Sequence, residues 1–227
     1  MSVCANVILV HGAWADGSSW SKVIPLLAQK GLNVSAVQLP LSSLVDDVAT
    51  VERALALVEG PTLLVGHSYG GSVISEAGLD AKVAGLVYVA AFAPDEGQSA
   101  GSLGASAAPT PLGACLVPDA HGYLKITQEG VFKYFAQDLT DAEKLVLYAT
   151  QTPANVQSLG GNISAPAWKI KPSWYIVASE DGAIQPSLER AMAETIGAET
   201  TEISASHVVM LSHPESVAAV ILKAAMG

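Results

Sequence analysis

The sequence predicts an α/β fold in which a mostly parallel sheet of about six strands is flanked by helices. Short apolar runs alternate with helical patterns over the first ninety residues, and the alternation resumes in the last third of the chain. Half of the 227 residues are hydrophobic and only 14% are charged, which suits strands that are buried on both faces. A chain of this length builds one substantial core, so we expect a single domain.

Four strands are expected in the first ninety residues, because each segment is a short run rich in Val, Ile and Leu. They are Asn6–Val10, Asn33–Gln38, Thr62–Val65 and Ala84–Val89. Apolar residues recur at helical spacing between positions 20 and 27, ahead of Gly31, and between positions 44 and 58, ahead of Gly60. These two stripes predict helices that face the core.

The last third continues the same order of elements. We expect strands at Ser173–Ala178 and Thr200–Ser204, with a helix from Pro186 to Ile196 between them and a final helix after the second strand. Ser212 and Glu215 form an S-x-x-E pattern ahead of an apolar stripe, which predicts a capping box at the start of the final helix.

About eighty residues separate two of the predicted strands, far more than a simple crossover needs. We therefore expect a core of residues 1–94 and 171–227, with residues 95–170 inserted as a helical cap over the carboxyl ends of the strands. The first part of the cap, Asp95 to Pro118, is rich in Gly, Ala, Ser and Pro and is expected to be loop. In the second part, one helix is expected to hold residues 131–135, and a capping box of Thr140 and Glu143 opens another.

The charge balance limits the partners of the chain. With 21 acidic against 11 basic side chains and no cluster of Lys or Arg, the sequence argues against nucleic acid and anionic lipid. No apolar stretch is long enough to span a membrane, and no basic region precedes the first apolar run, so we expect a cytoplasmic protein, either a monomer or a homodimer. Cys4 and Cys115 lie far apart, which predicts neither a disulfide framework nor a metal site, and no cofactor is expected.

The most informative motif is Gly66-His67-Ser68-Tyr69-Gly70, between a predicted strand and a run of small residues that can start a helix. In a G-x-S-x-G turn of this kind the serine is held in a strained conformation that exposes its hydroxyl. The turn closes only where the positions two before and two after the serine lack side chains. Ser68 is therefore the predicted nucleophile.

A serine hydroxyl needs a base to accept its proton and a carboxylate to orient that base. Of the five histidines, His207 directly follows the last predicted strand, at the carboxyl edge of the sheet, and is the predicted base. Asp181 follows Ser173–Ala178 and satisfies the chain order of serine, acid and histidine. Glu180 and Asp95 remain open as acids that would assist or replace it.

An acyl-transfer site also needs donors for the oxyanion and a pocket for the substrate. The predicted donors are the backbone N–H groups of Tyr69, directly after the serine, and Ala13, in the loop after the first strand. An apolar pocket is predicted from four aromatic residues and the neighbour of His207, namely Trp14, Phe92, Phe132, Phe135 and Val208.

Five segments, VHGAW, VGHSYGG, VYVAAFAPD, YIVASEDGAIQP and SHVVMLSHPE, together resemble the α/β-hydrolase superfamily. The resemblance is greatest to a branch of small esterases that includes the plant methylesterases and the hydroxynitrile lyases, and it is weakest in the cap. It implies Ser68, Asp181 and His207 as the catalytic triad, with Ala13 and Tyr69 as the oxyanion hole.

The lyases of this branch carry a lysine after the histidine and a threonine where this chain has Gly12. Here Val208 follows His207, so the cation that would take up the charge of cyanide is missing. The sequence therefore predicts a cofactor-independent carboxylesterase that cleaves small esters through an acyl-enzyme. A C–C lyase of the hydroxynitrile type and a catalytically silent receptor for a small ligand are the alternatives, and lactones and thioesters lie within the same mechanism.

Overall fold

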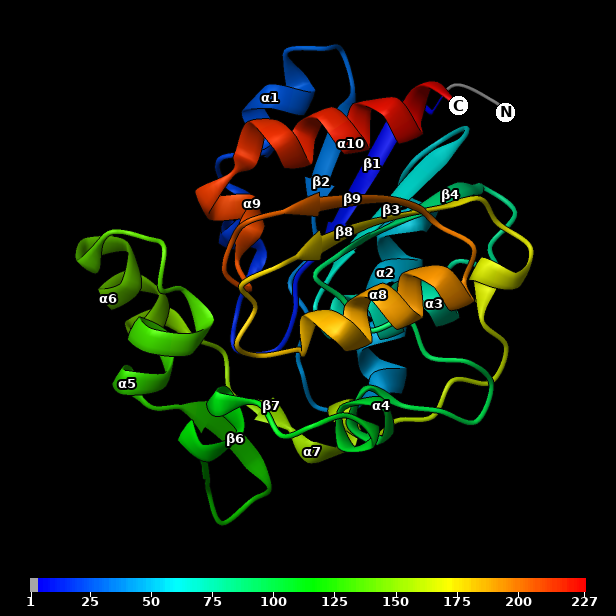
Figure 1. Ribbon diagram of the computed structural model, residues 1–227. Coiled ribbons are helices and arrows are strands. Elements are labelled where there is room, and N and C mark those ends of the chain that lie inside the picture. Colours follow the sequence, from blue (N-terminus) through cyan, green and yellow to red (C-terminus); the bar gives the residue numbers. More distant parts are fainter. Residues whose placement is uncertain (1–3) are drawn as a thin grey trace.

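The computed structural model describes residues 4–227 and confirms the predicted architecture (Figure 1). Its main sheet has six strands in the order β2-β1-β3-β4-β8-β9, and every neighbouring pair is parallel. The strands are β1 (Asn6–Val10), β2 (Asn33–Ala36), β3 (Thr62–His67), β4 (Val83–Val89), β8 (Ser173–Ala178) and β9 (Glu199–Ile203). All six predicted strands are thus present, with small shifts at their ends.

Helices cover both faces of this sheet. On one face lie α1 (Ile24–Ala28), α9 (Val209–Ser212) and α10 (Pro214–Met226), and on the other lie α2 (Leu44–Ala56), α3 (Gly70–Ala77) and α8 (Pro186–Thr195) (Figure 1). A short 3-10 turn, Gly17–Trp20, precedes α1. Because successive strand residues point to opposite faces, Val7 and Leu9 of β1 join one core while Ile8 and Val10 join the other.

The inserted segment between β4 and β8 contains its own small sheet and several short helices. Strands β5 (Leu116–Pro118), β6 (Tyr123–Ile126) and β7 (Ala154–Asn155) pair antiparallel. The helices are α4 (Ala100–Ser106), α5 (Gln128–Gly130), α6 (Asp141–Thr150) and α7 (Val156–Leu159), with a π-helical turn at Val131–Phe135 and 3-10 turns at Pro111–Cys115 and Ala167–Lys169. Figure 1 shows this green segment at the end of the sheet where the strands terminate.

One expectation for this segment is wrong. The stretch Asp95 to Pro118 is not simply loop, because it contains α4, a 3-10 turn and β5. Helix α4 begins at a capping box in which the side chains of Ser99 and Ser102 each accept the other's backbone N–H. Two reciprocal caps start a helix even where the composition is poor in strong helix formers.

The two predicted capping boxes have different outcomes. The Thr140 and Glu143 box is present at the start of α6, as predicted. The prediction of a capping box at Ser212 and Glu215 is wrong, since α10 begins at Pro214 without a side-chain cap. Ser212 instead ends α9, and its hydroxyl lies 3.0 Å from Nδ1 of His213.

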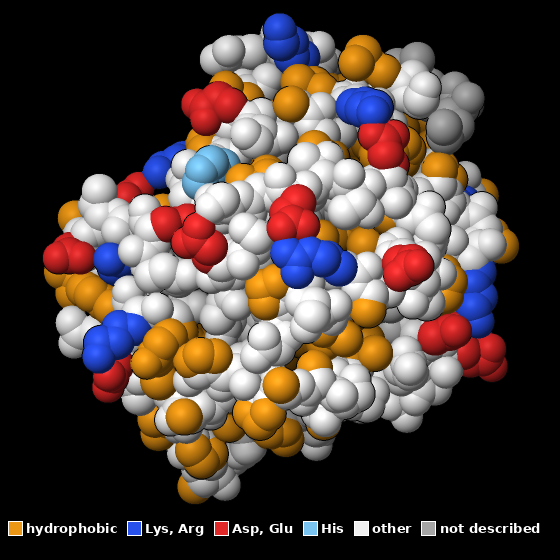
Figure 2. All heavy atoms as spheres, in the orientation of Figure 1, with side chains coloured by type: hydrophobic (Ala, Val, Ile, Leu, Met, Phe, Trp, Pro, Cys, Tyr) orange, Lys and Arg blue, Asp and Glu red, His pale blue; other side chains and the backbone are white. Residues whose placement is uncertain are grey.

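The surface differs between the two ends of the molecule. In the orientation of Figure 2, hydrophobic side chains gather in the lower part, where the inserted segment lies, and charged side chains spread mostly over the rest. Exposed apolar residues of this segment include Leu145 and Val146 on α6. Within residues 4–227, every helix is too short or too polar to cross a lipid bilayer.

Candidate active site

Ser68 occupies the sharp turn between β3 and α3, and its φ of 54° lies in the region that non-glycine residues rarely adopt. Three backbone hydrogen bonds hold it there. Its N–H donates to the carbonyl of Val89 at 3.2 Å, and its own carbonyl accepts from Gly71 at 3.0 Å and from Phe92 at 3.1 Å. Such strain persists only where the surroundings impose it, as they do at many functional sites.

Glycines make this turn possible. A Cβ at Gly66 would lie 2.5 Å from the carbonyl oxygen of Gly70, and one at Gly70 would lie 2.6 Å from the carbonyl oxygen of Val10. The loop after β1 packs equally closely against this turn, because a Cβ at Gly12 would lie 2.5 Å from Cβ of Ser68. The sequence pattern therefore reflects real contacts between backbones.

Ser68 lies at a cavity of about 160 Å³, formed between the sheet edge and the inserted segment. The lining residues are Ala13, Trp14, Ser68, Tyr69, Phe92, Ala100, Gly101, Gly104, Thr110, Leu112, Gly113, Leu116, Leu159, Ala183 and Ile184. A neighbouring cavity of about 500 Å³ shares Phe92, Gly104 and Ile184 with it. Apolar and uncharged polar side chains line both cavities, so the space in front of Ser68 suits an uncharged molecule.

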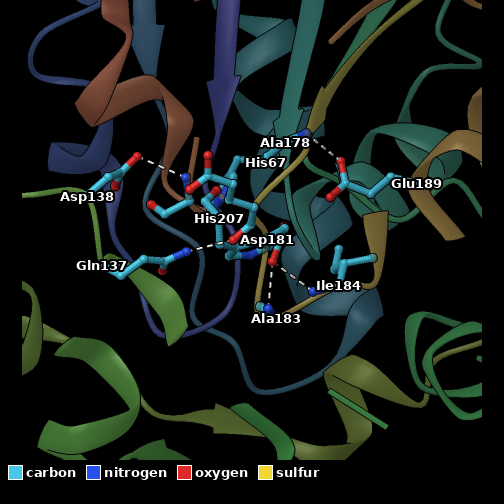
Figure 3. A network of polar contacts seen from close by, with 12 residues as sticks. His67, Gln137, Asp138, Ala178, Asp181, Ala183, Ile184, Glu189 and His207 are labelled. Carbon is cyan, nitrogen blue, oxygen red and sulfur yellow. Dashed lines mark hydrogen bonds and ion pairs between the residues drawn. The ribbon is translucent and has the colours of Figure 1, made fainter. Parts of the chain in front are cut away.

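The predicted acid and base lie together. Nδ1 of His207 is 2.5 Å from Oδ2 of Asp181, and both side chains are completely buried. The other carboxylate oxygen, Oδ1, accepts from the backbone N–H groups of Ala183 at 2.6 Å and Ile184 at 2.9 Å (Figure 3). Donation from Nδ1 to Asp181 leaves Nε2 as the second ring nitrogen of His207. Nε2 is buried and has no hydrogen-bond partner within the described residues.

The two alternative acids are engaged elsewhere. Glu180 is exposed and its carboxylate accepts a hydrogen bond from the hydroxyl of Ser204. Asp95 forms a surface ion pair with Lys169, with Oδ1 and Nζ 2.5 Å apart, and this contact lowers the pKa of Asp95. Of the three candidates, Asp181 is the one that contacts His207.

His67 contributes in a way that the sequence did not indicate. Its Nε2 donates to the backbone carbonyl of His207 at 2.9 Å, and the two ring centroids are 4.7 Å apart. Burial, followed by the neighbouring His207, lowers the pKa of His67 well below its ordinary value. A neutral His67, one residue before Ser68, thus joins the turn of Ser68 to the loop of His207. The 140 residues between the two histidines hide this contact in the sequence.

The inserted segment also holds the two loops that carry Asp181 and His207. Oδ2 of Asp138 accepts from the backbone N–H of Ser206 at 2.9 Å, and Nε2 of Gln137 donates to the carbonyl of Glu180 at 2.6 Å (Figure 3). Each contact lies one residue away from a predicted triad member, His207 or Asp181. Two adjacent side chains of the insertion therefore fix both loops.

The loop that carries Ala13 is fixed by His11. The ring of His11 donates from Nδ1 to the carbonyl of Gly12 at 2.8 Å and accepts at Nε2 from the N–H of Leu39 at 2.9 Å. Burial lowers the pKa of His11, so the ring is neutral and one nitrogen is free to accept. Ala13 and Tyr69 both line the cavity beside Ser68, where their backbone N–H groups were predicted to act.

Tyr69 is held by its side chain. Its hydroxyl donates to Oδ2 of Asp47 at 2.8 Å, and Oδ1 of Asp47 accepts from the N–H of Leu41 at 2.8 Å. Asp47 and Tyr69 are buried, and burial raises the pKa of both. The tyrosine ring therefore points into the core and anchors the first residue after Ser68 to α2.

The residues predicted for the pocket divide into two groups. Trp14 and Phe92 line the cavity at Ser68. Phe135 is buried with its ring centroid 5.1 Å from that of His207, Phe132 lies under Nζ of Lys144, and Val208 is completely buried in the core. These three residues are not part of the lining of the cavity at Ser68, and of them Phe135 packs against the ring of His207.

Trp14 separates two spaces. Besides the cavity at Ser68, it lines a cavity of about 320 Å³ beneath α6. Its φ is 60°, and its indole Nε1 donates to the carbonyl of Leu124 in β6 at 2.9 Å. The ring is thus held in place between the loop after β1 and the small sheet. Within residues 4–227, no three His, Cys, Asp or Glu side chains are grouped to hold a metal ion.

Comparisons with known proteins agree with this geometry. A family model described as "Alpha/beta hydrolase family" matches residues 7–220. The carbendazim hydrolyzing esterase of Nocardioides sp. is 32% identical over 52% of this chain, and the match spans about half (54%) of that enzyme. Methylesterase 7 of Arabidopsis thaliana is 27% identical over 96% of this chain and 95% of its own length.

A solved structure is similar over almost the entire chain. The crystal structure of a pyrethroid hydrolase from Sphingobium faniae JZ-2 superimposes with a TM-score of 0.83 at 26% sequence identity. The superposition covers 98% of this chain and 97% of that structure, so the inserted segment is included in the likeness.

Proposed function

Because this chain belongs to the alpha/beta hydrolase family, we propose that it is a serine hydrolase of small carboxylic esters. The family match confirms the resemblance drawn from the motifs, and two of the relatives compared are esterases by name. The single observation that carries the proposal is the pairing of buried His207 with Asp181, in a loop that His67 joins to the strained turn of Ser68.

The proposed chemistry uses five residues. Ser68 attacks the ester carbonyl while Nε2 of His207 accepts the hydroxyl proton, and Asp181 orients and stabilises the imidazolium that forms. The N–H groups of Ala13 and Tyr69 donate to the oxyanion of the tetrahedral intermediate. His207 then protonates the leaving alcohol, and it later activates a water molecule that releases the acid from the acyl-enzyme.

The cavities favour an uncharged ester as the substrate. A charged group at Ser68 would be desolvated by apolar walls without an opposite charge to compensate. The lyase alternative finds no support at the residue after His207, because Val208 is apolar and completely buried. A small ester that places its carbonyl at Ser68 and extends its apolar part into the neighbouring space fits both cavities.

We also propose that residues 95–170 act as the cap of the site, on a core of residues 1–94 and 171–227. Its support is that α4, the 3-10 turn at Pro111–Cys115 and α7 all contribute side chains to the cavity at Ser68. Location in the cytoplasm and a monomeric or homodimeric state stay predictions.

Replacement of the nucleophile tests the proposal. We expect Ser68→Ala to lower kcat on short p-nitrophenyl esters by a factor of about 10⁴ or more and to abolish labelling by a fluorophosphonate probe. The matched control is Ser106→Ala, an exposed serine on α4, which is expected to behave as the wild type. A folded Ser68→Ala protein with wild-type turnover would show that another residue is the nucleophile.

A further inference from the structure

A second carboxyl group lies behind the predicted triad. Glu189 of α8 is completely buried, and its Oε2 accepts from the backbone N–H of Ala178, the last residue of β8, at 3.1 Å (Figure 3). The other oxygen, Oε1, has no donor among the described residues. Glu189 faces Asp181, whose carboxyl group is, after burial, a cause of the raised pKa of Glu189.

Two carboxyl groups share a hydrogen bond only if one of them carries a proton. Asp181 already accepts three hydrogen bonds, from His207 at Oδ2 and from the N–H groups of Ala183 and Ile184 at Oδ1. Both oxygens of Asp181 are therefore occupied as acceptors. Glu189 accepts only one, from Ala178, so the proton belongs on Glu189.

The surroundings of Glu189 agree with a neutral acid. The ionisable groups that face it are Asp181 from the loop after β8, Tyr175 from β8 and Arg190 from α8. Tyr175 donates its hydroxyl to the carbonyl of Ala91. The Arg190 guanidinium is committed to the exposed carboxylate of Glu202, with contacts of 2.9 and 2.6 Å. Burial first, and then the charge of Asp181, raise the pKa of Glu189 well above its ordinary value.

We propose that Glu189 is a positioning residue, whose protonated carboxyl group donates a hydrogen bond to Asp181 and holds it against His207. The inference rests on the proposed ester hydrolysis by Ser68. A neutral donor at this place fixes the position of Asp181 and leaves a single negative charge beside the imidazole. It also connects α8, outside the site, to the acid of the triad.

Two substitutions separate positioning from simple packing. Glu189→Gln keeps the shape and replaces the proton by an amide donor, so kcat is expected to stay within about threefold of the wild type. Glu189→Leu keeps the bulk but removes the donor, and kcat is expected to fall about 10- to 100-fold with little change in KM. The control is Glu194→Leu, at an exposed position of the same helix, with wild-type kinetics expected. Thermal unfolding and fluorophosphonate labelling establish that each variant is folded.

The protonation of Glu189 is tested separately, through the pH dependence of stability. A group whose pKa is raised in the folded state contributes its stability fully below the unfolded-state pKa, about 4.3 for Glu, and loses it as pH rises towards the folded-state pKa. Wild type therefore loses stability through Glu189 as pH rises above about 4.3, whereas Glu189→Gln does not. The difference in Tm between Glu189→Gln and wild type is expected to increase from pH 4.5 to pH 7, and a difference that is constant with pH overturns the inference.

The outcomes distinguish this inference from the function on which it rests. If the wild type neither hydrolyses esters nor reacts with the fluorophosphonate, the proposed function fails. If the wild type is active but folded Glu189→Leu has the same kcat, or Glu189→Gln is as impaired as Glu189→Leu, only the role of Glu189 fails.

Discussion

At the scale of single residues, the site depends on side chains that are held from more than one direction. His207 is bonded to Asp181 through its ring and to His67 through its backbone carbonyl. Asp181 is bonded to two backbone N–H groups as well as to the imidazole. Supporting contacts of this kind hold side chains within the narrow geometric limits that the proposed ester hydrolysis requires.

Gly12 provides a test of how closely the oxyanion loop must approach the nucleophile. In Gly12→Ala the new methyl group would lie 2.5 Å from Cβ of Ser68 and 3.1 Å from Nδ1 of His67, so the loop must move away from the turn. The N–H of Ala13 would move with it. Loss of one oxyanion donor typically costs about 100-fold or more in kcat, and we expect a decrease of that order.

The measurement is kcat on a short p-nitrophenyl ester, together with thermal unfolding to confirm that the variant is folded. Wild-type kcat in folded Gly12→Ala would show that the loop tolerates the methyl group and that Ala13 is not a required donor.

Local sequence carries information about some of these residues and not about others. Ser68 was predicted because its strained turn demands glycines within two residues on either side, a requirement visible in five letters. The contacts of His67 and Glu189 were not predicted, because they join residues that are distant in the chain or on a different element. A buried glutamate on a helix gives no local sign of the carboxylate that it faces.

At the scale of elements, the strands were predicted correctly from their apolar runs, because strands that are buried on both faces consist mostly of apolar residues. The structure of the inserted segment was predicted less accurately. Four of the seven residues of helix α4 are Gly or Ser, which have weak helix preference, and its capping serines are common in loops too. The pattern at Ser212 and Glu215 fits a capping box, yet α9 ends there and the next helix starts at Pro214. Packing of neighbouring elements decides between such local alternatives.

Trp14 is where the loop after β1 meets the small sheet of the insertion, and it allows a test of substrate size. Its ring separates the cavity at Ser68 from the cavity beneath α6. In Trp14→Ala the two spaces join, so we expect kcat/KM for bulky esters to rise relative to short esters by about tenfold or more.

The matched control is Trp14→Phe, which keeps an aromatic wall but removes the indole donor to Leu124. It is expected to retain the wild-type preference for short esters. A preference that is the same in all three proteins would show that the two cavities do not set the size limit.

At the scale of the whole molecule, the distribution of ionisable groups determines how folding depends on pH. Most acidic side chains lie on the surface, whereas His11 and His67 are buried and support the loops that carry Ala13 and His207. Each of them accepts or donates as a neutral ring, and burial is the largest cause that lowers each pKa. Stability and the geometry of the site are therefore linked through the same two histidines.

We expect the free energy of unfolding to decrease as pH falls below about 6.5, the ordinary pKa of histidine in an unfolded chain. Because the folded-state pKa values are lowered, the unfolded chain binds more protons in this range, and acid favours unfolding. Each histidine contributes up to about 1.4 kcal/mol per pH unit between pH 6.5 and its folded-state pKa. Urea unfolding at several pH values measures this slope. His67→Gln is expected to reduce it, whereas His121→Gln, at an exposed turn, leaves it unchanged. Equal slopes in all three proteins would mean that His67 is not held neutral by the fold.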